Sequence, residues 1–111
     1  MKRIKISDLP EKGVSHNARI RKRQIIADGE VGPITNYARA VFPPGEKAGS
    51  HLHNDMAEVF TVESGHGEIR INDVAYVLAE GTVVVVEPGD VHEIINTSDS
   101  ELVVTYFGVR M

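Results

Sequence analysis

Three features are missing from this sequence of 111 residues: cysteine, long apolar runs and an apolar segment near the start. The absence of cysteine excludes disulfide bonds, thiolate metal ligands and cysteine nucleophiles. No apolar run approaches the ~20 residues of a membrane-spanning helix. The basic first residues lack the apolar stretch that a secretory signal requires. We therefore expect a cytoplasmic protein without a membrane partner, in which any metal ion is bound by histidine and carboxylate.

Positive charge is concentrated at the start of the chain. Residues 1–23 hold eight Lys and Arg against two acidic residues, so a net charge of +6 there leaves −10 for the remainder of a chain whose total is −4. The segment RIRKRQII has neither interleaved aromatic residues nor the pattern of a recognition helix, which argues against a nucleic-acid partner. We expect residues 1–34 to form a basic arm or strand that packs on the acidic body of its own or a neighbouring subunit.

Short apolar runs separated by turn residues fill the rest of the chain. Its length supports one domain. The runs lie at 35–42, 58–63, 68–71, 74–78, 82–87, 92–96 and 102–109, and Gly, Pro, Asn and Asp separate them. This spacing predicts an all-β domain over residues 35–111, a small antiparallel sandwich or barrel, with no helix after residue 57.

One of these strands has no polar alternation. Val83 to Val86 are four consecutive valines, a pattern typical of a strand covered on both faces. A single small barrel rarely covers both faces of a strand. We therefore expect a subunit interface and a homodimer.

A candidate metal site lies in the segment GEKAGSHLHNDMAEVFTVESG, residues 45–65. If the segment is extended, His51 and His53 point to the same side, because side chains two residues apart in a strand share a face. A following strand would bring Glu58 back to the same place. Imidazole and carboxylate together suit a divalent transition metal. On spacing alone, a polar hairpin whose histidines face water is an equally good interpretation.

A second pattern follows in GTVVVVEPGDVHEIIN, residues 81–96, where a glycine and an apolar strand lead to a Pro-Gly turn, His92 and Asn96. Together the two segments resemble both signature motifs of the cupin family. The first motif runs from Gly45 through the two histidines and Glu58 to Gly65, with every spacing matched. In the second motif, Glu87 occupies a position where proline is usual, with Pro88 beside it, a departure that affects the turn rather than a ligand.

The resemblance covers roughly residues 35–108 and implies a small antiparallel β-barrel of the jelly-roll type, also called a double-stranded β-helix. It further implies that His51, His53, Glu58 and His92 hold one metal ion. A barrel that has these residues but binds no metal is the alternative. The metal is expected to be Fe, Mn, Ni, Co, Cu or Zn. Tetrahedral zinc would be fully satisfied by four protein ligands, whereas an octahedral ion would keep two open positions.

Strand alternation predicts a mostly apolar pocket beside this ion. Phe60 and Val62 would share the face of Glu58, and Ile94 and Asn96 that of His92. Three further side chains are candidates for proton donation or for binding an anionic substrate, although a structural role is favoured for each. They are Tyr37, Arg39 and Tyr106.

Two functional classes remain open. The first is a metalloenzyme that acts on a small organic molecule, with the dioxygenase, isomerase, decarboxylase or lyase chemistry that the resemblance implies. The second is a non-catalytic, metal-dependent module that binds or senses a small molecule. A storage-type structural protein fits less well, because that branch of the superfamily typically lacks the metal ligands.

Overall fold

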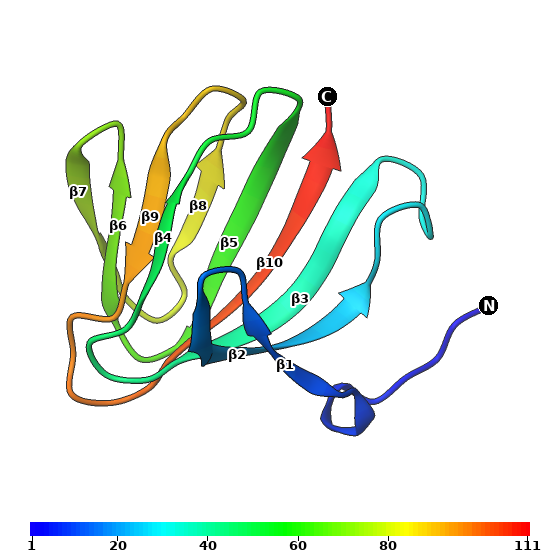
Figure 1. The fold of residues 1–111 in the computed structure, drawn as a ribbon, viewed down its shortest axis with the longest axis horizontal. Helices are drawn as coiled ribbons and strands as arrows, with labels where there is room; N and C mark the ends of the chain where they lie inside the picture. Colours follow the sequence, from blue (N-terminus) through cyan, green and yellow to red (C-terminus); the bar gives the residue numbers. More distant parts are fainter.

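The computed structural model describes residues 1–111 and consists of ten strands and one short 3-10 helix, η1 (Ile6–Asp8). The strands form two antiparallel sheets that face each other (Figure 1). The six-stranded sheet has the order β1 (Glu11–Val14), β2 (Asn17–Ile26), β3 (Ile34–Phe42), β10 (Leu102–Arg110), β5 (Met56–Ser64), β8 (Val83–Val86). The four-stranded sheet has the order β4 (Lys47–His51), β9 (His92–Ile95), β6 (Gly67–Ile71), β7 (Val74–Leu78). The predicted all-β, jelly-roll fold is confirmed, although the two sheets do not close edge to edge into a barrel.

All seven apolar runs form strands, each within two residues of its expected ends. The turn residues explain this agreement, because they mark where each extended segment must stop. No α-helix forms anywhere in the chain. In particular, none of its helical structure has the length and apolar character needed to cross a lipid bilayer.

The core lies between the two sheets and is built by strand alternation. Neighbouring strands place Ala40, Val104 and Val62 in one cross-strand row on the inner face, and each is at most 2% exposed. Phe60 on β5 and Ile94 on β9 are also buried in this core, as the alternation predicts. The inner face of the six-stranded sheet is therefore apolar along most of its length.

The outer face of the six-stranded sheet is also apolar in part. Val83 and Val85 on the edge strand β8 are 56% and 57% exposed. Further along the same sheet a shallow groove is lined by Ile26, Ile34, Tyr37, Thr61, Thr105 and Phe107. Within one chain, β8 is thus covered on its inner face only.

Candidate metal centre

The four predicted metal ligands come from both sheets. β4 and β9 are neighbours, and their register sets His51 directly opposite His92. Glu58 lies on β5 in the facing sheet, where it is almost fully buried. His53 follows the end of β4, so strand alternation does not fix its direction. Its loop is instead held to the β8–β9 turn by a backbone hydrogen bond from Gly89 to the carbonyl of His53, 2.7 Å long.

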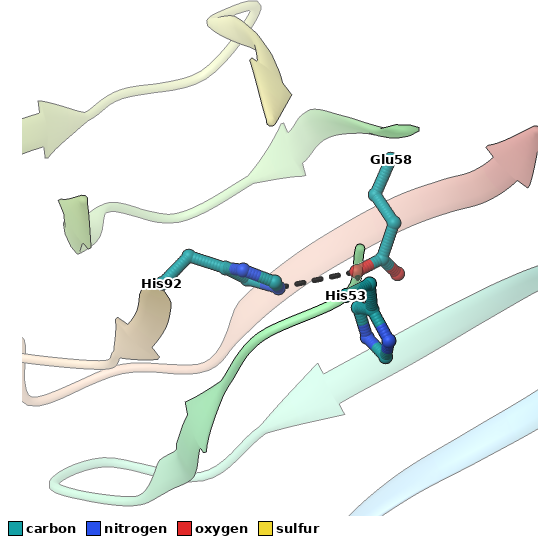
Figure 2. Close-up of side chains that lie close together, drawn as sticks. All are labelled: His53, Glu58 and His92. Atoms are coloured by element: carbon teal, nitrogen blue, oxygen red, sulfur yellow. Dashed lines mark ion pairs between the residues drawn. The ribbon is translucent and has the colours of Figure 1, made fainter. Parts of the chain in front are cut away.

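Three of the four side chains meet. One potential ligand atom from each of His53, Glu58 and His92 lies within 4.8 Å of the other two. Oε1 of Glu58 is 3.1 Å from Nε2 of His92 and 3.4 Å from Nε2 of His53, and Figure 2 shows His92 reaching this carboxylate. Two ligands ~2.1 Å from one ion would be roughly 3.0 Å apart at a right angle and roughly 3.4 Å apart at the tetrahedral angle. The donor atoms are therefore of the right kind, and Glu58 is at the right separation from each histidine, to share a divalent transition metal.

His51 lies beside this group. Its ring centre is 5.8 Å from that of His92 and 6.2 Å from that of His53, and the His53 and His92 rings are 5.9 Å apart. The three imidazoles therefore form a nearly equilateral triangle. The ligand atoms that meet do not include one from His51.

The environment of His92 sets its tautomer. Nδ1 lies 3.2 Å from the backbone carbonyl of Asp90, and because a carbonyl only accepts hydrogen bonds, Nδ1 must be the donor. In the neutral ring, Nε2 then keeps its lone pair and points at the Glu58 side of the cluster. A hydrogen bond that fixes the second ring nitrogen in this way is usual for a metal-binding histidine.

The two histidines opposite each other on β4 and β9 have pKa values shifted in opposite directions. Burial lowers the pKa of His51, and the neighbouring His92 lowers it further. Burial also acts to lower the pKa of His92, but the hydrogen bond to Glu58 and the Asp90 carbonyl outweigh it, so that this pKa is raised. In the metal-free protein His92 is therefore protonated more readily than His51.

The cluster lines a cavity of about 430 Å³. Phe60, Ile94 and Val104 form part of its wall, as expected for a mostly apolar pocket. Tyr106 also lines the cavity, and its ring stacks on Phe60 with centres 5.4 Å apart. Burial raises the pKa of Tyr106 and outweighs a hydrogen bond to Asn36, which acts to lower it, while the charge of Glu58 acts in the same direction as burial. Its phenol is therefore a protonated hydrogen-bond donor at neutral pH.

The structure places the other two candidate side chains on the outer face of the six-stranded sheet. Tyr37 packs edge-on against Phe107 in the shallow outer groove. Arg39 pairs with Glu63 at 2.7 Å. Of the three candidates, only Tyr106 therefore lines the cavity with the metal cluster.

Several polar residues of the cavity have no signal in the sequence motifs. They are Ser15, Lys22, Asp28, Thr35, Asn36 and Arg110. Four of them lie on β2 or β3 or in the loop between those strands, and Arg110 ends β10. Strand alternation would have found Asn36 if β3 had been paired with β10 in the correct register, because Asn36 lies opposite Gly108, which itself lies opposite Glu58.

Comparisons with known proteins agree with this fold. A curated relative, an oxalate-binding protein of Thermotoga maritima, is 30% identical over 66 residues, which are 60% of this chain and 54% of that protein. The chain thus matches little more than half of this relative's length.

Solved structures are similar over nearly the whole chain. The crystal structure of a predicted oxalate decarboxylase from Thermotoga maritima has a TM-score of 0.92 and 19% identity, and the match covers 99% of this chain and 100% of the other. A sugar phosphate isomerase from a cupin superfamily, from Silicibacter pomeroyi, has a TM-score of 0.83 and 15% identity, with 99% and 76% covered. The family model of the cupin domain, Cupin_2, matches residues 38–108, and the chain belongs to this family.

Proposed function

We propose that the protein holds one divalent transition metal ion with His51, His53, Glu58 and His92, and that a small carboxylic acid binds at the remaining coordination positions of the ion. The observation that carries the proposal is the meeting of His53, Glu58 and His92 at one end of a 430 Å³ cavity. We include His51 because its ring centre lies 5.8 Å from that of His92. The relative named as an oxalate-binding protein supports a small carboxylate as the ligand class.

Different residues of the chain have different roles at this site. The metal, when bound, polarises a ligand oxygen as a Lewis acid. His92 is oriented by its hydrogen bond to Asp90, and Phe60 with Ile94 excludes water from one side of the cavity. Tyr106 lies on β10 opposite Phe60, two residues from the position opposite Glu58. Its protonated phenol is therefore available to a ligand that is bound near Glu58.

The first candidate activity is that of a metalloenzyme of the lyase or dioxygenase type. In a decarboxylation, the bond between the carboxyl carbon and its neighbour breaks, CO2 leaves, and the electron pair left behind takes up a proton. Tyr106 is the donor that we assign to this proton. Its phenol is partly buried and lines the same cavity as the cluster, and general acid catalysis contributes about 10²–10⁴-fold.

The second candidate is a binding module without turnover. The name of the oxalate-binding relative favours it. The two candidates share the metal site and differ in whether the ligand is consumed.

The test begins with metal analysis of protein purified without a chelator or a histidine tag. Oxalate binding is then measured calorimetrically with and without the metal, and the products of prolonged incubation are identified. Metal-dependent binding with formation of CO2 supports the enzyme, and a Tyr106→Phe variant should then bind oxalate normally but turn it over at least a hundredfold more slowly. Metal-dependent binding without products supports the module, and absence of both metal and binding contradicts the proposal.

We propose in addition that the protein is a homodimer in which a second copy covers the outer face of the six-stranded sheet. Val83 and Val85 project from this face and are more than half exposed in the single chain. The apolar groove around Tyr37 and Phe107 continues the same surface. An antiparallel sheet with one solvated face normally presents polar residues there, so this apolar face fits a subunit contact.

A further inference from the structure

One lysine lies on the inner face of the sheet. Lys22 on β2 is opposite Ala40 on β3, and the same cross-strand row continues through Val104 and Val62. The other three members of the row are buried and apolar. Lys22 therefore projects into the space between the sheets, where it lines the same cavity as the metal cluster.

The charge of Lys22 is not balanced within the chain. The cations on the outer face of β2 are paired, since both Arg21 and Arg23 contact Glu11. Lys22 takes part in no ion pair. Every fully buried side-chain nitrogen and oxygen has a hydrogen-bond partner and the side chain of Lys22 has none, so its ammonium group is not fully buried. Partial burial of an unpaired charge is unfavourable, and an anion in the cavity would relieve it.

The neighbouring strand adds to this positive potential. Lys12 on β1 lies directly opposite Lys22. Residues directly opposite each other in an antiparallel pair share a face, and like charges at such positions repel. The β1–β2 hairpin thus brings two lysines to one face with no carboxylate between them. Glu11 lies on the other face, where it pairs with the arginines of β2.

The position of Lys22 sets the length of a ligand that could reach both it and the metal. Glu58 lies four residues along β5 from Val62, the member of the Lys22 row on that strand. Three strand spacings separate β2 from β5. On a flat sheet these offsets would place the two Cα atoms roughly 19 Å apart, before the side chains and the curvature of the sheet shorten the separation. Oxalate bound at the metal would not span this gap.

We propose that Lys22 is a specificity-determining residue that binds the distal carboxylate of an elongated dicarboxylic acid, whose other carboxylate binds the metal. The inference rests on the proposed function, because it assumes a metal-bound carboxylate at the His53, Glu58 and His92 end of the cavity. It assigns the opposite end, beneath the β1–β2 hairpin, to a second anionic group. The apolar wall formed by Phe60, Val104 and Ala40 suits the methylene chain between the two.

The test measures binding of oxalate, succinate, adipate, suberate and the monomethyl ester of the tightest-binding diacid to the metal-loaded protein. We expect Lys22→Met to weaken binding of the longer diacids by roughly tenfold to a hundredfold, the range for a hydrogen bond to a charged group. Oxalate and the monoester should bind equally well to both proteins. Lys47→Met is the matched control, because Lys47 is an exposed lysine on β4 that does not line the cavity, and it should change nothing.

The outcomes separate the two proposals. If the unmodified protein binds oxalate but no longer diacid, or if Lys22→Met binds every diacid as tightly as the unmodified protein, Lys22 is not the determinant and the metal-site proposal stands. If the metal-loaded protein binds no carboxylate at all, both proposals fail. Lys22→Gln serves as a second variant of similar length, and thermal unfolding of both variants should show no loss of stability, because each removes an unpaired charge from the inner face.

Discussion

Among the five histidines of the chain, His92 is the one that the fold buries, with 4% of its surface exposed. Both of its ring nitrogens are engaged, Nδ1 by the Asp90 carbonyl and Nε2 by Glu58. A buried imidazole with both nitrogens engaged is held in one orientation before the metal arrives. Little ordering then remains to oppose metal binding, and His92 should contribute more to affinity than the half-buried His51.

Replacement of His92 by alanine tests this role. Metal affinity should fall at least tenfold, because the loss of even an indirect partner of a metal ligand commonly costs that much. His66→Ala is the control, since His66 is exposed in the turn between β5 and β6 and outside the cluster. Metal content measured by mass spectrometry, with circular dichroism to confirm folding, gives the result. An unchanged content in His92→Ala would show that His92 is not a ligand.

Protonation of His92 should govern the pH dependence of metal binding. Burial acts to lower the pKa of His92, but Glu58 and the Asp90 carbonyl raise it above its ordinary value of 6.5. Only the neutral ring binds a metal, so metal affinity should fall as the pH is lowered. The fall should begin while the pH is still above 6.5 and amount to about tenfold per pH unit for each proton displaced. Burial lowers the pKa of His51, so protons should compete with the metal for this ring only at a lower pH. Chelator competition between pH 5.5 and 8 measures the profile, and a constant affinity down to pH 6 would contradict it.

Among the structural elements, the turns are the easiest to predict from the sequence. Gly65, which closes the first motif, has φ of +82°, and a Cβ atom there would collide with the backbone carbonyl of Glu101. Gly81, which opens the second motif, has φ of +84° but open space around it. One glycine is thus required for its backbone conformation and for close packing, the other for its conformation alone.

Alanine at the two positions should separate these requirements. Gly81→Ala should lower the free energy of unfolding by about 1 kcal/mol, the cost of a positive φ for a residue with a side chain. Gly65→Ala should cost roughly 1–3 kcal/mol more, because the β5–β6 turn must also move away from Glu101. Urea unfolding of both variants measures the difference. Equal losses in the free energy of unfolding would mean that the backbone around the carbonyl of Glu101 can shift without cost.

The strands themselves were predictable because their patterns are local, but their partners were not. Turn residues predicted the ends of β3 and of the strands after β4, and alternation from Glu58 correctly predicted that Phe60 and Val62 face inward. The direction of Lys22 depends on its register with Ala40 on β3, which no local pattern contains. A basic segment is ordinarily interpreted as exposed, whereas Lys22 lies on the inner face of the sheet.

The candidate site was predictable to a similar extent. The motif spacing indicated the residues that meet, but not that His53 lies beyond the end of β4 or that the His51 ring lies beside the group. The outward direction of Tyr37 and Arg39 also depends on strand register. These details require tertiary structure, because each depends on where two distant segments come together.

For the molecule as a whole, the fold does not determine the chemistry. Two solved structures with TM-scores of 0.92 and 0.83 to this chain are named for a decarboxylase and a sugar phosphate isomerase. Function must therefore be argued from the cavity and its side chains. Assembly likewise depends on a particular surface, and we propose that this surface is the outer face of the six-stranded sheet.

A charge on that face should disrupt the proposed dimer. Val85→Glu should weaken association by roughly tenfold or more, since a buried unpaired carboxylate is costly at an interface. The stability of the single chain should change by about 0.5 kcal/mol at most, because Val85 is exposed there. Val77→Glu is the control, an equally apolar and more exposed position on β7 of the other sheet. Sedimentation equilibrium measures both, and a purely monomeric unmodified protein would contradict the proposal.

The origin of the ligands in two different sheets has a mechanical consequence. His51 and His92 belong to strands of one layer, and Glu58 belongs to a strand of the other, with no strand pairing between the layers. An ion bound by all of these side chains would link the two sheets at this end of the molecule. Loss of the ion should allow the two sheets to separate locally at this end first. Amide hydrogen exchange should then become faster around β9 and the start of β5. At the opposite end, where the side chain of Asn96 donates a hydrogen bond to the carbonyl of Phe42, exchange should stay slow.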